Sequence, residues 1–361
     1  MASGVGCVWK CLWYDCMMEI LRHYGIDLSI TLIAIVAVGV FLSPLMIIPL
    51  IILLIMEISF SFDNAVVNAK VLERMSPIWQ KMFLTVGIFI AVFGMRFLFP
   101  IAIVAITAGI GFGDVVNLAF GDAVGYAEKL DAAHPLISMF GGVYLMLIFL
   151  TFIFEDRDTK WLYFIEKPLA KVGKLANLSY VLTGVFILVA AATFGQAHQL
   201  EILTAGFVAM VLFMAVNALS SIFEVNDDEQ QKKPVRHGWG AFALFMYLEV
   251  QDSAFSLDGV SAAFAVTNSI VLIAIGLGIG SLFVRSMTVH LVKTGKLAEF
   301  RYLEHGAHWA IGALALCMLI GISSIHIPEY VVGLVGVVFI VSALVHSHRL
   351  NKHEARVPAT A

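Results

Sequence analysis

Residues 57–64 read Glu57-Ile58-Ser59-Phe60-Ser61-Phe62-Asp63-Asn64, and residues 252–259 read Asp252-Ser253-Ala254-Phe255-Ser256-Leu257-Asp258-Gly259. Both stretches follow the order acid, any residue, small residue, Phe, Ser, apolar residue, Asp, and both lie inside long apolar segments. A carboxylate in hydrocarbon is unfavourable by a few kcal/mol even on the mildest scale. Because such a pair recurs in both halves of the chain, the sequence predicts a cation site at the interface between two repeats.

The composition is typical of an integral membrane protein. The chain of 361 residues is 60% hydrophobic and 13% charged, with a mean hydropathy of +0.93, whereas soluble domains carry about 25% charged residues. The apolar runs are about 20 residues long and lack strict alternation, which predicts helices. We therefore expect an all-α polytopic protein with the lipid bilayer as its surroundings and no nucleic-acid partner.

Ten spans are expected in this fold. Residues 101–113 are apolar but short and glycine-rich, so they either extend the third span or form a re-entrant piece. The expected spans are 27–43, 45–70, 80–99, 136–154, 178–194, 200–223, 240–266, 269–290, 303–322 and 328–347.

The spans divide the chain into two halves. The expected organisation is a cytosolic amphipathic segment at 1–26, a first transmembrane repeat at 27–223, a cytosolic linker at 224–239, the core of the second half at 240–347 and a cytosolic tail at 348–361. The second repeat itself is expected to begin near residue 200.

The basic residues predict the orientation. With a cytosolic N-terminus, all but three of the 22 Lys and Arg residues lie in inside segments; the exceptions are Lys129 outside and Arg96 and Arg285 at membrane depth. Cytosolic loops are rich in Lys and Arg, so we expect both termini in the cytosol and the protein in a bacterial inner membrane. Spans two and seven then run in opposite directions. Five spans per half is an odd number, which predicts an inverted 5+5 repeat.

Helical geometry leaves two alternatives for the motif. At 100° per residue, Glu57, Ser61 and Asn64 share one helix face, while Asp63 points elsewhere. Either each copy sends its acids to different neighbours, or the helix is locally unwound between Ser and Asp so that the acids and freed carbonyls converge.

The second copy repeats this geometry. Glu249, Asp252 and Ser256 share one face, and Asp258 points elsewhere. Gly259 favours unwinding beside Asp258.

The side chains of both copies supply oxygen ligands. Carboxylate, amide and hydroxyl oxygens suit Mg²⁺, Ca²⁺ and Mn²⁺. The four acids Glu57, Asp63, Asp252 and Asp258 overneutralise one divalent ion, so a proton or an arginine is expected to compensate. Protonation suggests proton antiport.

Other roles for the polar residues stay open at this stage. A single acid can be a structural partner of Arg96 or Arg285. Ser61 and Ser256 can be ligands or can bond back to a helix carbonyl. Glu249 can be a ligand or a gate.

At these residues the chain resembles the TerC family of membrane proteins. Glu57-(x5)-Asp63-Asn64-Ala65 looks like that family's first signature, and Leu248-Glu249-Val250-Gln251-Asp252-(x5)-Asp258 looks like its second. The resemblance covers roughly residues 45–345 and is closest to a longer branch listed as a domain of unknown function. It implies a relation to the lysine-exporter superfamily. It also implies manganese export, with metal handled by Glu57, Asp63, Asn64, Asp252 and Asp258.

The expected function is export of a divalent cation, Mn²⁺ above all, by alternating access with acids at the membrane midplane. Arg96 and Arg285 are expected to balance charge. The alternatives are a transporter of Ca²⁺ or another solute and a non-transporting membrane stress or scaffold protein. We expect no enzymatic activity and no bound cofactor beyond the transported ion. The sequence leaves open a homo-oligomer and other membrane partners.

Overall fold

The computed structural model describes residues 23–175, 177–194, 199–222, 235–267, 269–295, 299–323 and 327–354. This part of the chain is helical, and an isolated bridge joins Met75 and Arg236. The all-helical class expected from composition is confirmed. The first described helix covers His23–Leu42 and ends in the π-helical η1, Val38–Leu42.

The helices of the first half range in length from three residues in η2 to 32 in α7. They are η2 (Pro44–Met46), α2 (Ile47–Phe60), α3 (Phe62–Leu72), α4 (Pro77–Met82), the π-helical η3 (Phe83–Gly87) and η4 (Ile90–Leu98), α5 (Phe99–Ala108), α6 (Phe112–Gly121), α7 (Ala123–Phe154), α8 (Tyr163–Val172) and α9 (Leu178–Phe194).

The helices of the second half are mostly long. They are α10 (Gln199–Ile222), α11 (Gly238–Val266), α12 (Ile270–Thr294), α14 (Leu303–Gly321) and α15 (Glu329–Glu354).

Seven described helices are long and apolar enough to cross a membrane. The bent pair of α2 and α3 makes an eighth if it counts as one span. Two expected spans are absent from this set: α9, whose apolar part is shorter, and α11, which carries three acids along its 29 residues. Each of the ten expected spans nevertheless coincides with helix. The seven are His23–Leu42, Pro77–Ala108, Ala123–Phe154, Gln199–Leu219, Ile270–Thr294, Leu303–Gly321 and Val331–Lys352.

Several boundaries differ from the expected ones. Residues 101–108 extend the third span, because the helix continues through Pro100 to Ala108. The segment 113–135, which lies between the third and fourth expected spans, is helical except at Asp122, which accepts a hydrogen bond from the Gly125 amide (3.0 Å) and so starts α7. Residues 348–354 continue α15 instead of forming a tail. The expected N-terminal segment up to residue 22 and most of the linker, residues 223–234, lie outside the described residues.

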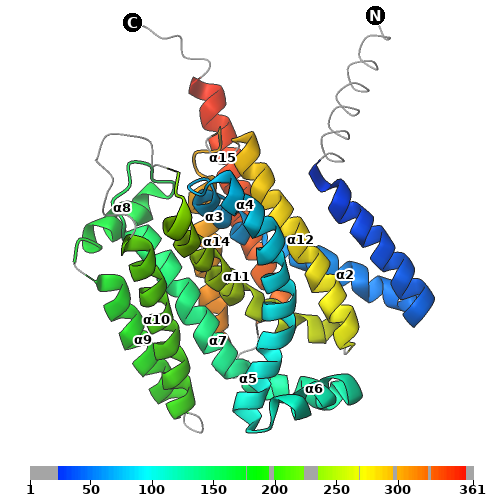
Figure 1. Ribbon diagram of the computed structural model, residues 1–361. Helices are drawn as coiled ribbons and strands as arrows, with labels where there is room; N and C mark the ends of the chain where they lie inside the picture. Colours follow the sequence, from blue (N-terminus) through cyan, green and yellow to red (C-terminus); the bar gives the residue numbers. More distant parts are fainter. Residues whose placement is uncertain are drawn as a thin grey trace, which may run out of the picture.

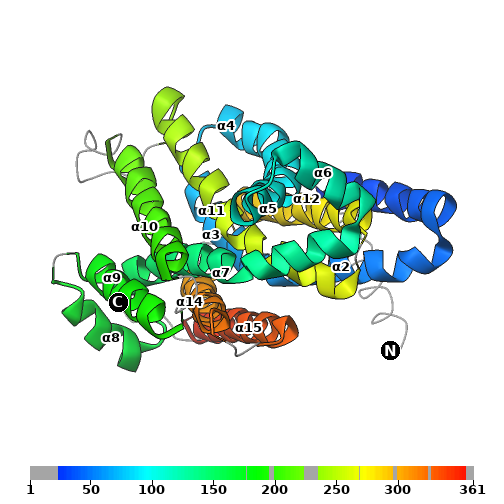
Figure 2. The ribbon, with the colours of Figure 1, turned by 90° about the horizontal axis from the view of Figure 1, so that it is seen from below.

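The helices pack side by side around α7, α11 and α14. In Figures 1 and 2, α8, α9 and α10 lie on the opposite side of the molecule from the first described helix. The helix α7 packs against α14, α10 and α11, while α2 and α3 pack against α12. The beginning of the first described helix and the end of α15 lie at the same end of the molecule, the upper end in Figure 1, which also carries α8.

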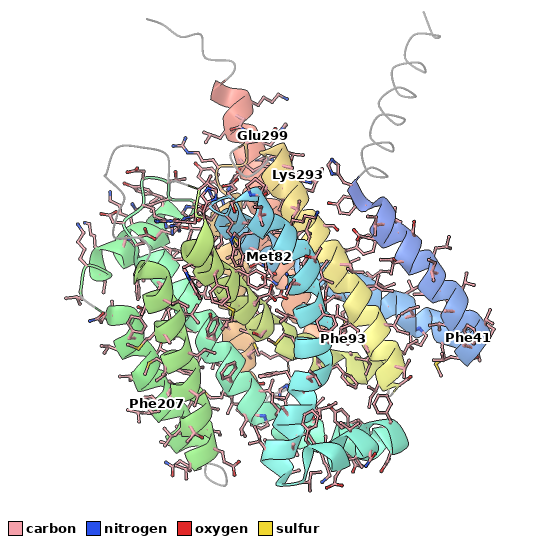
Figure 3. The ribbon with its side chains drawn as sticks, viewed as in Figure 1. Phe41, Met82, Phe93, Phe207, Lys293 and Glu299 are labelled. Atoms are coloured by element: carbon pink, nitrogen blue, oxygen red, sulfur yellow. The ribbon has the colours of Figure 1, made fainter. Side chains whose placement is uncertain are left out.

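Apolar side chains face outward along the flanks. Phe41 and Phe207 project from opposite sides, whereas Lys293 and Glu299 lie near the end that carries α8 (Figure 3). Phe41 is 82% exposed, as a lipid-facing side chain would be. An exposed apolar belt of this kind is compatible with a multi-pass membrane protein.

The helix α8 is anchored by a buried carboxylate. Glu166 accepts hydrogen bonds from the Trp161 amide (2.9 Å), the Leu162 amide (3.2 Å) and the Trp309 indole (3.0 Å). The His305 ring lies 3.1 Å from its second oxygen. Burial raises the pKa of Glu166, but these hydrogen bonds outweigh burial and lower the pKa to about 2. The segment between α7 and α8 is thereby tied to α14.

Candidate functional site

The first copy of the motif lies at a break between two helices. The α2 helix ends before Ser61, whose φ and ψ are −99° and 13°, and the axis of α3 is bent by 48° from that of α2. The Ser61 amide still donates to the Glu57 carbonyl (3.0 Å), and the Ala65 amide donates to the Ser61 carbonyl (3.1 Å). The break places Asp63 in the first turn of α3, where a helix N-terminus stabilises negative charge. The Asn64 amide donates to Asp63 Oδ1 (2.9 Å).

The second copy lies in an unbroken helix. The α11 helix runs from Gly238 to Val266 without interruption. Of the two alternatives for the motif, a local break therefore holds for the first copy and a regular helix for the second. Gly259 does not unwind α11, because its neighbours all remain helical. The two copies share a pattern of residue types but differ in backbone conformation.

An arginine pairs with the acid of the first copy. Arg96, in the π-helical η4, forms a buried ion pair with Glu57 Oε1, and Ser61 Oγ donates to the same oxygen (3.1 Å). The Arg96 guanidinium also donates to the Ala91 carbonyl (3.3 Å). Ser61 thus bonds to an acid side chain instead of back to a helix carbonyl.

A second arginine binds two of the three acids of α11. Arg285 donates to Glu249 through two hydrogen bonds of 3.1 Å and to Asp252 Oδ2 at 3.1 Å. It also donates to the Phe83 carbonyl (3.0 Å), and its guanidinium carbon lies 4.2 Å from the centre of the Phe83 ring. Arg285 is 2% exposed, so its charge is compensated entirely inside the protein.

Amide side chains join the two copies. Asn64 Nδ2 donates to Asp252 Oδ1 at 2.6 Å, and Gln251 Nε2 lies 3.4 Å from Asn68 Oδ1. These residues are at most 7% exposed. The Asn64 and Gln251 side-chain oxygens have no hydrogen-bond partner among the described residues. Since buried polar atoms are nearly always paired, these two acceptors retain unused capacity to accept a hydrogen bond.

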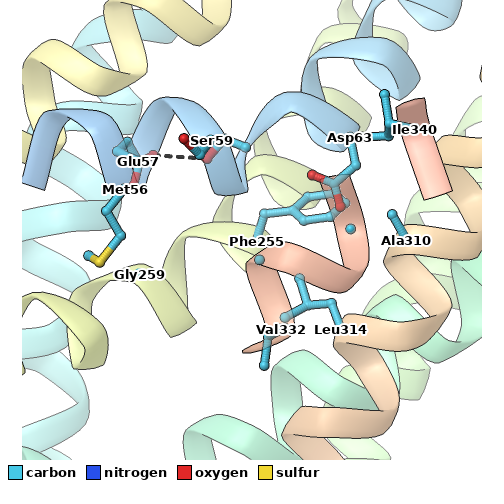
Figure 4. A pocket seen from close by; sticks show the side chains of 13 residues that line it. Met56, Glu57, Ser59, Asp63, Phe255, Gly259, Ala310, Leu314, Val332 and Ile340 are labelled. Carbon is cyan, nitrogen blue, oxygen red and sulfur yellow. Dashed lines mark hydrogen bonds between the residues drawn. The ribbon is translucent and has the colours of Figure 1, made fainter. Parts of the chain in front are cut away.

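A small cavity opens beside the break. Its volume is about 50 Å³, enough for a few water molecules. Glu57 and Asp63 line it from α2 and α3, Phe255 and Gly259 from α11, and Ala310 from α14 (Figure 4). The remaining walls are mostly apolar and come from α14 and α15: Leu314, Val332, Gly333, Gly336 and Ile340. Two carboxylates therefore line one small cavity.

Glycines bring the helices close to the acids. A Cβ added to Gly280 of α12 would overlap the Glu57 side chain, and one added to Gly87 of η3 would overlap Glu249 and Arg285. Each glycine belongs to one half of the chain and meets an acid of the other half. The two acids can be this closely packed only because no side chain occupies these positions.

The site residues predicted from sequence are only partly gathered in the cavity. Glu57 and Asp63 line it, whereas Asp252 and Glu249 lie at Arg285, linked to α3 by Asn64. The backbones of Ser256 and Asp258 lie in α11, but their side chains are outside the described part of the structure. Among the described residues no group of three or more His, Cys, Asp and Glu side chains is placed to hold a metal ion. Convergence of four acids on one ion, which includes Asp258, stays a prediction.

Sequence reasoning missed four members of this site. Asn68 and Gln251 are uncharged, and Gly87 and Gly280 resemble the many glycines of apolar helices. For Asn68, the spacing of four residues from Asn64 is a usable signal, because it places both amides on one helix face.

These features define a class of protein. It is an all-helical protein, compatible with a multi-pass membrane protein, that carries a network of acids and arginines buried among its apolar helices. Residues 62–354 match the sequence model of a family described as "Protein of unknown function (DUF475)", and the chain belongs to this family. No curated protein and no solved structure matches the chain. The family description does not mention TerC, so that relation stays an expectation.

Proposed function

We propose that the protein exports a divalent metal cation, Mn²⁺ above all, across a bacterial inner membrane by alternating access. The observation that carries the proposal is the cavity at the helix break, which Glu57 and Asp63 both line. Acidic residues are rare in apolar membrane helices because their burial is unfavourable, and those that occur often mark ion pathways. Broken helices are a recurrent way to build such sites in transporters.

The charge of the network suits a divalent cation. Of the four described carboxylates, Glu57 pairs with Arg96, Glu249 and Asp252 pair with Arg285, and Asp63 lines the cavity. Among these described groups the acids exceed the arginines by two charges, which one divalent cation or two protons would neutralise. Exchange of the two would leave the buried charge unchanged. This balance supports proton-coupled antiport.

The ligand chemistry supports a hard cation. The cavity is bordered by carboxylate and hydroxyl oxygens, including those of Ser59 and Ser61. Oxygen donors suit Mn²⁺, Mg²⁺ and Ca²⁺. Mn²⁺ is proposed first because the resemblance to TerC proteins implies it, and competition among the three ions is the direct test.

Three correspondences support an inverted 5+5 repeat. Arg96 pairs with Glu57 of the first motif copy, and Arg285 pairs with Asp252 of the second. The motif helix of each half also packs on the arginine helix of the other half: α2 and α3 pack on α12, and α11 packs on η4. In the same way, Gly87 of the first half lies against Glu249 of the second, and Gly280 of the second half lies against Glu57 of the first. With the basic segments in the cytosol, the end that carries α8 faces inward.

The test is metal flux in proteoliposomes. Wild-type protein should carry Mn²⁺ across the vesicle membrane, and Asp63→Asn, which keeps the side-chain shape, should abolish the flux. The matched control is Asp114→Asn, because Asp114 is an exposed acid at the start of α6, remote from the cavity. Normal flux through Asp63→Asn would overturn the proposal. Absence of flux in the wild type would favour the scaffold alternative. If Ca²⁺ inhibits the flux more strongly than Mg²⁺ or unlabelled Mn²⁺ does, the transported ion is Ca²⁺.

A further inference from the structure

A second, larger cavity lies at the end of the molecule that carries α8. Its volume is about 500 Å³, and charged side chains dominate its walls. We call it the basin; it is lined by Lys70, Glu155, Asp156, Arg157, Asp158, Thr159, Phe300, Arg301, Glu304 and His305. The basin is open to solvent and far larger than the acid-lined cavity of 50 Å³.

The basin and the acid-lined cavity share two helices. On α3, Asp63 lines the cavity and Lys70 lines the basin; on α14, Ala310 lines the cavity and Glu304 lines the basin. Asp63 and Lys70 are seven residues apart and so lie on one face of α3, about 10 Å from one another along the axis. Because α3 packs against α14, the two spaces are at opposite ends of one helix interface.

Apolar side chains close the interface between them. Val66 and Val67 of α3 lie between Asp63 and Lys70 in sequence, and Ala307 of α14 lies between Glu304 and Ala310. All three belong to one hydrophobic cluster and are at most 5% exposed. No ion could cross this layer while the helices stay in contact, since a charge in apolar surroundings is strongly destabilised.

An ion-pair bridge holds the same interface at the basin. Glu304 of α14 pairs with Lys70 of α3 (3.6 Å) and with Arg157 of the segment after α7 (3.0 Å). Both pairs are partly exposed, so they stabilise the contact only weakly. The other end of α3 is the break at Ser61, which can serve as a hinge for the whole helix.

We propose that the α3–α14 interface is the gate between the acid-lined cavity and the side of the membrane on which the basin lies. In this structure the gate is closed by Val66, Val67 and Ala307 and held by Glu304. Movement of α3 about Ser61 would part the apolar layer and join the two spaces. The inference rests on the proposed function only for the identity of what passes, a divalent cation.

The test measures access of a thiol reagent to the apolar layer. The protein, with its four natural cysteines replaced by serine, carries Val67→Cys and reacts in detergent with a charged, water-soluble methanethiosulfonate. The reaction should be slow and should become about five-fold faster when Glu304→Gln removes the two ion pairs. If Val67→Cys fails to fold, Ala307→Cys reports on the opposite wall of the same interface.

Two matched controls separate the gate from general loosening. Asp156→Asn removes an acid of the basin whose ion pairs are with Lys160 and Lys174, and it should leave the rate unchanged. Val104→Cys lies in a separate buried cluster, and Glu304→Gln should not accelerate its reaction. An unchanged rate at Val67→Cys, or equal acceleration at Val104→Cys, would overturn the gate. Labelling needs no transport, so a failure of Mn²⁺ flux would overturn the proposed function and not the gate.

Discussion

Gly280→Ala tests whether the acid of the first motif copy depends on close approach of α12. The added Cβ would fall 2.5 Å from Glu57 Cβ and 3.7 Å from its carboxyl carbon, and it would also overlap Cγ. The Glu57 Cβ is fixed to the backbone, so no rotation of the side chain removes this contact. Either the backbone at Glu57 or the distance between α2 and α12 must therefore change.

Two responses are available, and their energies decide between them. If Glu57 leaves its position, the buried pair with Arg96 is broken, at about 3–5 kcal/mol. If α2 and α12 move apart instead, the overpacking destabilises by about 1–3 kcal/mol. The second response is smaller and should prevail. Alanine also favours the helix by about 1 kcal/mol over glycine, so the expected net loss of unfolding free energy is about 0–2 kcal/mol.

The measurement combines unfolding in detergent with Mn²⁺ flux in proteoliposomes. Gly280→Ala should lower the unfolding midpoint and slow the flux, because separation of the helices shifts Glu57 relative to Asp63. Gly184→Ala is the control, since no atom lies within 4 Å of a Cβ added there, and it should be neutral or slightly stabilising. If the two variants behave alike in both assays, the reasoning from close approach is refuted.

Three further predictions concern the charged groups. Ser61→Ala removes a 3.1 Å hydrogen bond to Glu57 and should reduce stability by about 1 kcal/mol and slow flux without abolishing it; full flux would show that the hydroxyl is dispensable. Arg285→Ala removes the ion pairs of two buried acids and should lower the unfolding free energy by about 3–5 kcal/mol. Arg285→Lys should be intermediate, because an ammonium keeps the charge but cannot form the two-bond contact with Glu249 together with the bond to Asp252; equal stability of the alanine and lysine variants would contradict this. The Glu166 carboxyl has its pKa lowered from 4.5 to about 2 on folding, so its stabilisation is complete above pH 4.5 and is lost as the pH falls toward 2. Glu166→Gln should therefore unfold with a flatter pH dependence below pH 4.5, and an unaltered acid profile would rule this out.

The helices themselves were predictable because length and apolarity are local properties. All ten expected spans coincide with helix, and the two that are not plainly apolar spans have visible causes: α9 is short, and α11 carries acids. The break in the first copy was one of two alternatives allowed by the positions of Ser61 and Asp63. The regular course of α11 was equally allowed, because nothing local to Gly259 distinguishes a helical glycine from an unwound one.

The partners of the polar residues depended on tertiary packing. That Arg96 and Arg285 need acids follows from burial of charge, but which acid each one binds is fixed by helix contacts over 39 and 36 residues. Contacts between the halves, such as Asn64 with Asp252 over 188 residues, leave no periodic signal in one sequence. The same holds for Gln251 and Asn68, whose importance arises only from their shared burial. The side chain of Asp258 lies outside the described part, so its place in the site stays a prediction.

The acids of α11 also bear on how the chain enters the bilayer. Glu249, Asp252 and Asp258 lie within one helix, and an Asp at the centre of an inserting helix opposes translocon-mediated insertion by about 2.5–3.5 kcal/mol. The helix α11 is therefore a poor insertion signal by itself. Arg285 of the next helix, α12, offers the compensating charge, and the connection between α11 and α12 is short. The two helices are expected to partition into lipid as a preformed hairpin, so that assembly of the buried charge network begins during biogenesis and not after it.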